Sequence, residues 1–357
     1  MSRLDAHYDA LRQRPGIEPV DFDLGPLPAD RLRRRFVAAD DPGTVASAFD
    51  RTTLIATGIG MTGPPHLGTV GQLYTAIELQ AAGLDVQLVL ADLEPYHGGR
   101  ADLDTVCRRA ARYRRLALDL GFDPEQGRLR TQTGATDVLQ TAAVLAPYYD
   151  RSELEPESVP RTEWEQAVED TYERRGRNGE GPTSETARRL SGLLHGADFL
   201  HPLAEAEYDT VVVTMGADEY RLVPWTRAFL AAAPVEGTVA GLYTRLLTGV
   251  NDAPKMGRSL PGSGLALGDD PDRLREWIER AEPRTDPSAS VIVQATRLAA
   301  PGDAFDPERV EAACRNGGEE WDTITSAYAE HVAGLAERWQ SYRVDPSGTS
   351  SEGARRT

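Results

Sequence analysis

A loop at residues 251–270, NDAPKMGRSLPGSGLALGDD, contains the only lysine of the 357-residue chain, Lys255. Arginine supplies the other 38 basic residues, so a primary amine stands at one place in an otherwise arginine-based sequence. Arg258 follows three residues later, and glycines and prolines surround both cations. Two cations on a flexible loop can close over a polyphosphate and neutralise charge as a P–O bond breaks. An ordinary solvated basic turn is the alternative interpretation.

A glycine-rich stretch, TGIGMTGPPHLGT at residues 57–69, is a second candidate for phosphate chemistry. It lies between a predicted strand and a predicted helix. Glycine lets a backbone approach a ligand closely, and the free N–H groups at the start of a helix favour an anion. His66 is placed to donate to a phosphate oxygen, although a helix-capping or core histidine would occupy the same position. The glycines concerned are Gly58, Gly60, Gly63 and Gly68.

The sequence MGADE at residues 215–219 is a third candidate, because it directly follows the predicted strand YDTVVVTM. In open α/β sheets, ligands bind outside the carboxyl ends of strands, where a carboxylate can accept from ribose hydroxyls. Asp218 would also serve as a plain N-cap of the next helix, and the two roles are compatible.

Strands and helices must position these residues, and their pattern in the sequence predicts an α/β fold with a Rossmann-like parallel sheet. Short β-branched or apolar runs alternate with helical periods, which is typical of right-handed βαβ units. From residue 273 to 342 the apolar period is helical throughout, which predicts an all-helical region. The strands are predicted at 52–57, 85–93, 128–133 and 208–215.

This pattern divides the chain into an N-terminal extension (1–50), a catalytic domain (51–250), the lysine loop (251–270) and a helical domain (271–343). A polar segment at about 150–185 is predicted to be a surface insertion in the catalytic domain, helical in its middle. The last residues, 344–357, have the composition of a disordered tail.

Composition limits the class of protein. The formal charge of −17 indicates an acidic surface and lowers the expectation of indiscriminate nucleic-acid binding. Two arginine-rich runs, RLRRR at 31–35 and RRAARYRR at 108–115, suit either phosphate contacts or ion pairs on helix surfaces. The sequence has no apolar run long enough to span a membrane, no apolar leader and only two cysteines, so we expect a cytoplasmic protein without a disulfide framework.

Taken in order, these segments resemble the class I aminoacyl-tRNA synthetases. HLGT (66–69) is similar to the HIGH motif of that family, and KMGRS (255–259) is similar to its KMSKS motif. The resemblance is closest to the tryptophanyl and tyrosyl branch, and the helical tail looks more like the tryptophanyl members. Further segments that resemble this branch are ADLEPY, GFDPEQGRLRTQT, HGADFL, GADE and the Asp-Asp-Pro helix start after the lysine loop.

The resemblance implies ATP-dependent activation of an amino acid and transfer of the aminoacyl group to tRNA by a homodimer. Mg²⁺ would accompany ATP, held by phosphate and water more than by dedicated protein ligands. His66, Lys255 and Arg258 would be the catalytic residues. The implied ATP-binding residues are Thr62, Gly63, His66, Gly68, Thr69, Gly216, Asp218, Glu219, Lys255, Met256, Arg258 and Ser259.

The chain departs from the family pattern at several of these positions. Thr69 replaces the second histidine of HIGH, Gly257 and Arg258 alter KMSKS, and Glu219 stands where the branch usually has glutamine. The amino-acid site implied by the resemblance consists of Ala56, Gly58, Gly60, Glu94, His195 and Asp198.

These substitutions leave three functions open. Ala56 replaces a tyrosine of the tyrosyl enzymes, so tryptophan is the favoured amino acid. His195 and Glu94 are unusual for tryptophanyl relatives and suit a more polar side chain. The alternatives are a paralogue that activates a nonstandard amino acid, for tRNA or for another acceptor in specialised metabolism, and an inactive paralogue that binds tRNA or a protein.

Overall fold

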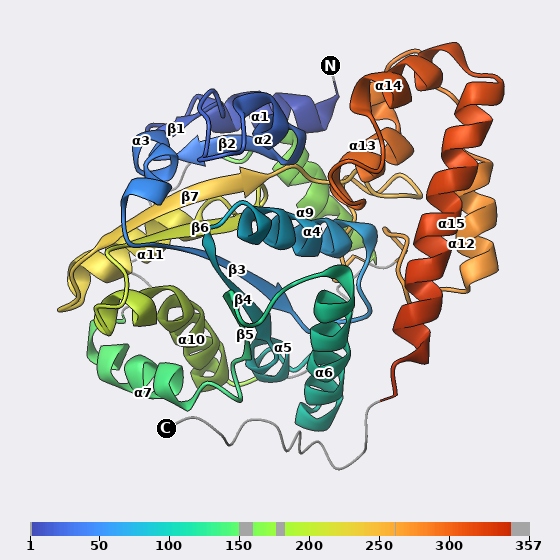
Figure 1. Ribbon diagram of the computed structural model, residues 1–357. Helices are drawn as coiled ribbons and strands as arrows, with labels where there is room; N and C mark the ends of the chain where they lie inside the picture. The colour runs from blue at the N-terminus through green and yellow to red at the C-terminus, as the bar shows by residue number, and fades with distance from the viewer. Residues whose placement is uncertain (1, 150–159, 176–182, 261, 344–357) are drawn as a thin grey trace.

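The computed structural model describes residues 2–149, 160–175, 183–260 and 262–343, and these residues form one sheet flanked by helices (Figure 1). The parts of the polar segment at 150–159 and 176–182, and the predicted tail at 344–357, lie outside the described residues. The strands are β1 (Ile17–Glu18), β2 (Phe36–Asp40), β3 (Thr53–Gly60), β4 (Asp85–Ala91), β5 (Gly127–Thr131), β6 (Thr210–Gly216) and β7 (Thr238–Thr244).

Several helices begin at polar side-chain caps. Asp102 accepts from the backbone N–H of Thr105 at the start of α6, and Ser184 and Ser290 cap α10 and α13 in the same way. The helices are α1 (Arg3–Arg12), α2 (Ala29–Arg35), α3 (Pro42–Ala46), α4 (Leu67–Ala81), α5 (Leu93–His97), α6 (Leu103–Leu120), α7 (Thr136–Leu145), α9 (Glu163–Arg175), α10 (Glu185–Ala204), α11 (Leu222–Ala232), α12 (Pro271–Glu279), α13 (Val291–Leu298), α14 (Pro307–Asn316) and α15 (Glu319–Ser341).

The strand order is β1-β2-β7-β6-β3-β4-β5, and β7 through β5 run parallel. The four predicted strands correspond to β3, β4, β5 and β6. The N-terminal extension adds β1 and β2, and β2 pairs antiparallel with β7, so the sheet is mixed at this edge rather than wholly parallel. From β3 the chain builds outward to β4 and β5, then returns to β6 on the other side of β3. The carboxyl ends of β3 and β6 therefore flank the point where the strand order reverses, which is the usual ligand site of such sheets.

Alternate residues of the central strands supply two hydrophobic cores, one on each face of the sheet. On β3, Ile55 and Ile59 pack in the core that includes α4, α6 and the C-terminal helices. Leu54 and Ala56 point to the opposite face, where the core includes α1, α7, α10 and α11. Side chains alternate between the two faces along each strand. At a strand end, they therefore point in turn to the face covered by α4 and to the face covered by α10.

The C-terminal segment is helical, as its sequence predicts, and within the described residues 262–343 it contributes no strand to the sheet. In Figure 1, α12 and α15 lie side by side at the edge of the molecule, and α13 packs against α4. That contact is close, since a Cβ added at Gly71 of α4 would come within 3.2 Å of Leu298. Among the residues that the structure describes, no helix has the length and apolar character needed to cross a membrane.

Candidate active site

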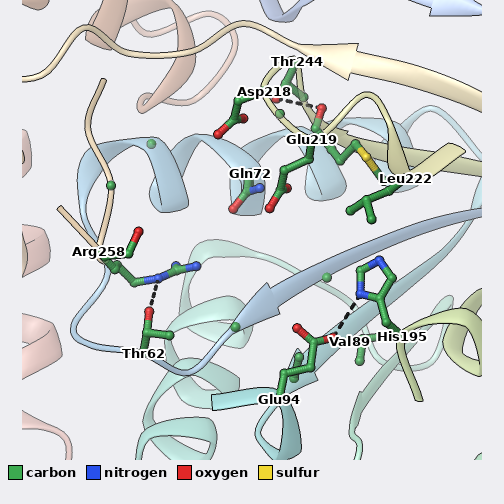
Figure 2. Close-up of a pocket in the computed structure, with 18 of the residues that line it drawn as sticks. Thr62, Gln72, Val89, Glu94, His195, Asp218, Glu219, Leu222, Thr244 and Arg258 are labelled. Carbon is green, nitrogen blue, oxygen red and sulfur yellow. Dashed lines mark hydrogen bonds and ion pairs between the residues drawn. The ribbon is translucent and has the colours of Figure 1, made fainter. Parts of the chain in front are cut away.

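A cavity of about 420 Å³ opens at the carboxyl ends of β3, β4 and β6 (Figure 2). The loop after β3 and the start of α4 form one wall, the turn after β6 a second, and α5 with α10 a third. Residues 255–259 of the lysine loop line a further side of the cavity. The three segments that sequence patterns single out, although far apart in the chain, meet in this cavity.

His66 precedes the first residue of α4 and makes no side-chain capping hydrogen bond. Its Nδ1 is buried and has no hydrogen-bond partner in the described part of the chain. Burial first, and then the charges of Arg258 and Lys255, hold the pKa of His66 well below its ordinary value, so the imidazole is neutral at pH 7. Gly68 makes room for this ring, because a Cβ there would lie 2.8 Å from the Cε1 of His66.

Lys255 forms an ion pair with Asp218, which follows β6. The two side chains are only 16% and 17% exposed. Burial alone would lower the pKa of the Lys255 ammonium, but the Asp218 carboxylate outweighs it and raises that pKa above the ordinary value. The lysine therefore stays charged where it lines the cavity, and it ties the loop to the turn after β6.

Arg258 binds the glycine-rich loop and the start of α4. Its Nε donates to Thr62 Oγ1 at 3.0 Å (Figure 2). Its Nη1 donates to Thr69 Oγ1 at 2.7 Å. The threonine that replaces the second histidine of HIGH thus accepts a hydrogen bond from the arginine of the altered KMSKS motif. The two departures from the family pattern are one contact in the structure.

Glu219 extends into the cavity, which Gln72 lines from α4 (Figure 2). Desolvation by the surrounding walls, and then the neighbouring Asp218 carboxylate, raises the pKa of Glu219. The Lys255 ammonium opposes this shift. Glu219, Asp218 and Lys255 therefore form one electrostatic group on the side of the cavity next to the lysine loop.

Glu94 and His195 form an ion pair on the opposite side, with Nδ1 of His195 3.0 Å from Oε1 of Glu94 (Figure 2). Burial alone would raise the pKa of Glu94 and lower that of His195, but their mutual attraction reverses both shifts, so the pKa of Glu94 is lowered and that of His195 is raised. Their attraction therefore favours the ionised form of the pair. The Nε2 of His195 is buried without a hydrogen-bond partner in the described residues.

Asp198 lines the same end of the cavity but is engaged by the protein itself. Arg130 donates to its Oδ1 at 2.7 Å and Gln132 donates to its Oδ2 at 2.7 Å. Gln132 is fixed in this orientation because its amide oxygen accepts from the backbone N–H groups of Leu93 and Glu94. Burial raises the pKa of Asp198, and the Arg130 guanidinium offsets this only in part.

The structure brings most of the predicted site residues together, while their roles stay predictions. Three of them do not line the cavity. Ala56 is buried in the core beneath α10, Gly63 uses its carbonyl to accept from Tyr113, and Thr69 reaches the site only through Arg258. The predicted residues that line it are Gly58, Gly60, Thr62, His66, Gly68, Glu94, His195, Asp198, Gly216, Asp218, Glu219, Lys255, Met256, Arg258 and Ser259.

Several polar residues of the site were not predicted from the sequence. Gln72 and Arg100 line the cavity, and Arg130 and Gln132 support it from β5 and the turn that follows. Gln72 lies one helical turn after Gly68, so the helical period of α4 was a usable signal for it. Arg130 and Gln132 gave none, because their partner Asp198 lies more than 60 residues away in sequence.

The two arginine-rich runs are largely engaged inside the protein. In the first, Arg31 and Arg35 bind Glu78. In the second, Arg112 stacks 4.2 Å over the ring of Trp339, Arg115 lies over Tyr342, and the remaining arginines bind neighbouring groups. These contacts favour the ion-pairing alternative over a phosphate-binding face. Within the described ranges, no cluster of three or more His, Cys, Asp or Glu side chains has metal-site geometry.

Comparisons with known proteins agree with this geometry. Residues 50–157 match the family model described as tRNA synthetases class I (W and Y). Tryptophan--tRNA ligase 2 of Halobacterium salinarum is 28% identical over 286 residues, which are 77% of this chain and 67% of that protein. Tryptophan--tRNA ligase 1 of the same organism is 27% identical over 217 residues, 59% of this chain but only 38% of that relative's length.

The fold is that of solved synthetases. The tryptophanyl-tRNA synthetase from Aeropyrum pernix superposes with a TM-score of 0.69 at 21% identity, covering 94% of this chain and 92% of that one. The tyrosyl-tRNA synthetase from Archaeoglobus fulgidus gives 0.62 at 17% identity, covering 87% and 98%. Sheet, cavity and C-terminal helices together define a class I synthetase fold. The chain is therefore similar in part of its sequence and in its fold to the tryptophanyl and tyrosyl branch of the class I synthetases.

Proposed function

We propose that this protein activates an amino acid with ATP and transfers the aminoacyl group to tRNA, with tryptophan as the amino acid. One observation carries the proposal: the cavity brings a buried neutral histidine and two loop cations to the strand end where Asp218 and Glu219 lie. The family match and the names of the two Halobacterium relatives support the reaction class and the amino acid.

The proposed reaction has two steps. A carboxylate oxygen of the amino acid forms a bond to the α-phosphorus of ATP, the bond from that phosphorus to the bridging oxygen breaks, and pyrophosphate leaves. A ribose hydroxyl of tRNA then attacks the acyl carbon and AMP leaves. The enzyme contributes alignment and charge neutralisation.

The residues suit distinct roles in the first step. His66, uncharged, donates one N–H to a phosphate oxygen without adding a cation. Lys255 and Arg258 neutralise the departing pyrophosphate. Asp218 and Glu219 accept from the ribose hydroxyls. The described residues offer no multidentate metal cage, so we propose that Mg²⁺ arrives bound to the phosphates and keeps its water ligands.

A screen of pyrophosphate exchange into ATP over the standard amino acids, with and without tRNA, tests the proposal. Exchange that depends on tryptophan, followed by charging of tRNA, is the expected result. The absence of exchange with every amino acid would overturn it. The homodimer and the cytoplasmic location stay predictions from sequence.

A second function, activation of a more polar or nonstandard amino acid, is favoured by the side of the cavity opposite the lysine loop. An indole N–H needs an acceptor. Both Asp198 oxygens are already held by protein donors, while the ionised Glu94–His195 pair faces the same space. Adding nonstandard amino acids with polar side chains to the exchange screen separates this alternative from the first.

A further inference from the structure

Helix α9 belongs to the polar segment that the sequence predicts to be a surface insertion, yet one side of it is buried. Trp164, Val168 and Thr171 are 2%, 9% and 1% exposed. Trp164, Val168 and Tyr172 recur every four residues, so they share a face that spans about two helical turns. That face packs toward α1 and the lysine loop.

Two hydrogen bonds from this face bracket the loop. The indole Nε1 of Trp164 donates to the carbonyl of Pro254 at 3.1 Å, directly before Lys255. The hydroxyl of Tyr172 lies 2.7 Å from Oγ of Ser259, directly after Arg258. Both cations therefore lie between two points at which the helix holds the loop.

The helix itself is fixed to the body of the protein. Glu165 of α9 forms ion pairs with Arg14 at 4.0 Å and with Arg221 at 3.5 Å. The ring of His7 lies 4.5 Å from the ring of Trp164, and its Nε2 lies 3.4 Å from the carbonyl of Ala217. Because Ala217 directly precedes Asp218, the helix is anchored to the same strand end that pairs with Lys255.

We propose that Trp164 and Tyr172 are positioning residues, through which α9 orders the loop at residues 254–259 before substrate binds. This rests on the proposed function in so far as the ordered loop serves ATP. A loop rich in glycine and proline has many conformations. If its catalytic groups become ordered only during the reaction, the entropy cost of ordering them lowers the rate. The helix removes that requirement by holding both flanks of the loop.

The single lysine supplies a readout that needs no substrate. An amine-reactive acylating reagent modifies only Lys255 and the α-amino group, and peptide mass spectrometry separates the two. The rate of modification at fixed pH follows the population of the open loop. Loss of one net hydrogen bond is expected to raise that rate by roughly 2- to 12-fold.

The test compares two variants with two matched controls: Tyr172→Phe removes the hydroxyl and keeps the ring, and Trp164→Phe removes the indole N–H and leaves a smaller aromatic ring. Tyr148→Phe and Trp277→Phe make the same exchanges at exposed rings, which are 40% and 38% exposed. Faster modification in both α9 variants, a larger increase in the double variant and no change in the controls are expected. In exchange assays the α9 variants should lose kcat while the KM for the amino acid stays within about twofold.

Other results would overturn the proposal. Unchanged modification of Lys255 in both α9 variants would show that the helix does not hold the loop. A lower Tm with unchanged modification and unchanged kcat would assign Trp164 and Tyr172 a purely structural role. Faster modification in a protein that shows no exchange with any amino acid would support the positioning role while rejecting the proposed function.

Discussion

The ammonium of Lys255 donates to Oδ2 of Asp218, and this ion pair joins the lysine loop to the turn after β6. The only primary amine of a side chain thus has its own counter-ion inside the site. A triphosphate that enters the cavity competes with Asp218 for this cation. The pair holds the lysine charged and close to where phosphate oxygens are proposed to lie.

Replacing Lys255 by alanine should lower amino-acid-dependent pyrophosphate exchange by about 10²-fold or more, the scale expected for the loss of one charge contact in a transition state. Lys255→Arg should recover part of the activity, since it keeps the charge but not the compact ammonium. Arg280→Ala is a matched control, because Arg280 is an exposed cation on the surface of the helical segment. Equal exchange in Lys255→Ala and in the wild type would remove the lysine from the reaction.

Asp218→Asn should loosen the loop that Lys255 anchors. Without the carboxylate the pKa of Lys255 falls, because burial then acts without its main opposing charge. We expect faster acylation of Lys255 at pH 8 and a lower Tm than in the wild type. Slower acylation than in the wild type would contradict this, and a Tm measured alongside shows whether the protein remains folded.

The ionised pair of Glu94 and His195 predicts a pH window. The pKa of His195 is raised in the folded protein, so the ion pair with Glu94 stabilises the fold. The contribution of His195 to this stability is complete below the ordinary histidine pKa of about 6.5 and is lost as pH rises through the raised pKa. The pKa of Glu94 is lowered, so its share is lost only in acid. The KM for the amino acid should therefore stay constant from about pH 5 to 6.5 and change at higher pH.

His195→Gln tests the same pair. It keeps a donor near Glu94 but removes the titration, so the change in KM above neutral pH should disappear while the KM for ATP stays unchanged. A pH profile for the variant that matches the wild type would mean that the pair does not contact the amino acid. Loss of this pair is expected to change the KM for the amino acid, whereas loss of Lys255 is expected to change catalysis, so kinetics distinguish the two.

Much of the sheet could be predicted because β3, β4 and β6 are nearly continuous apolar runs. β7 was missed since Gly241 lies in its middle and weakens the strand pattern. The structure explains that glycine: an added Cβ would come within 2.9 Å of Val223. Antiparallel β2 was missed because it follows directly on the arginine run at 31–35, with no turn signal between them.

The site could be predicted only in part, because only some of its residues belong to a local sequence pattern. Loops with local signatures were found, including the glycines before His66 and the lone Lys255. The engagement of Asp198 by Arg130 depends on pairing between distant elements, which no local pattern records. A helix was predicted in the middle of the polar segment, but the buried face of α9 formed by Trp164 and Thr171 was not, because the polar composition hides it.

Stability below neutral pH should report on the buried His66. Its pKa is well below the ordinary value in the folded protein, whereas the unfolded chain takes up a proton near pH 6.5. The unfolded state therefore binds more protons as pH falls, and folding loses up to about 2 kcal/mol between pH 7 and pH 5 from this group. His66→Gln should lose less over the same range in urea unfolding. Parallel curves for both proteins would show that His66 titrates normally.

Gly68→Ala tests whether His66 must occupy its observed position. The added Cβ would lie 2.8 Å from Cε1 of His66, so the ring has to move. Alanine favours a helix over glycine by up to about 1 kcal/mol, which offsets part of the strain in stability. We therefore expect a modest change in Tm but a loss of kcat of at least tenfold, because a small displacement of a catalytic group is costly.

Gly334→Ala is the matched control, since Gly334 also lies in a helix and nothing lies within 4 Å of an added Cβ. It should raise the Tm and leave kcat unchanged. Full activity in Gly68→Ala would mean that the displaced imidazole has no part in the reaction. A loss of kcat in Gly68→Ala with a Tm close to that of the wild type would place the effect on the position of His66 rather than on folding.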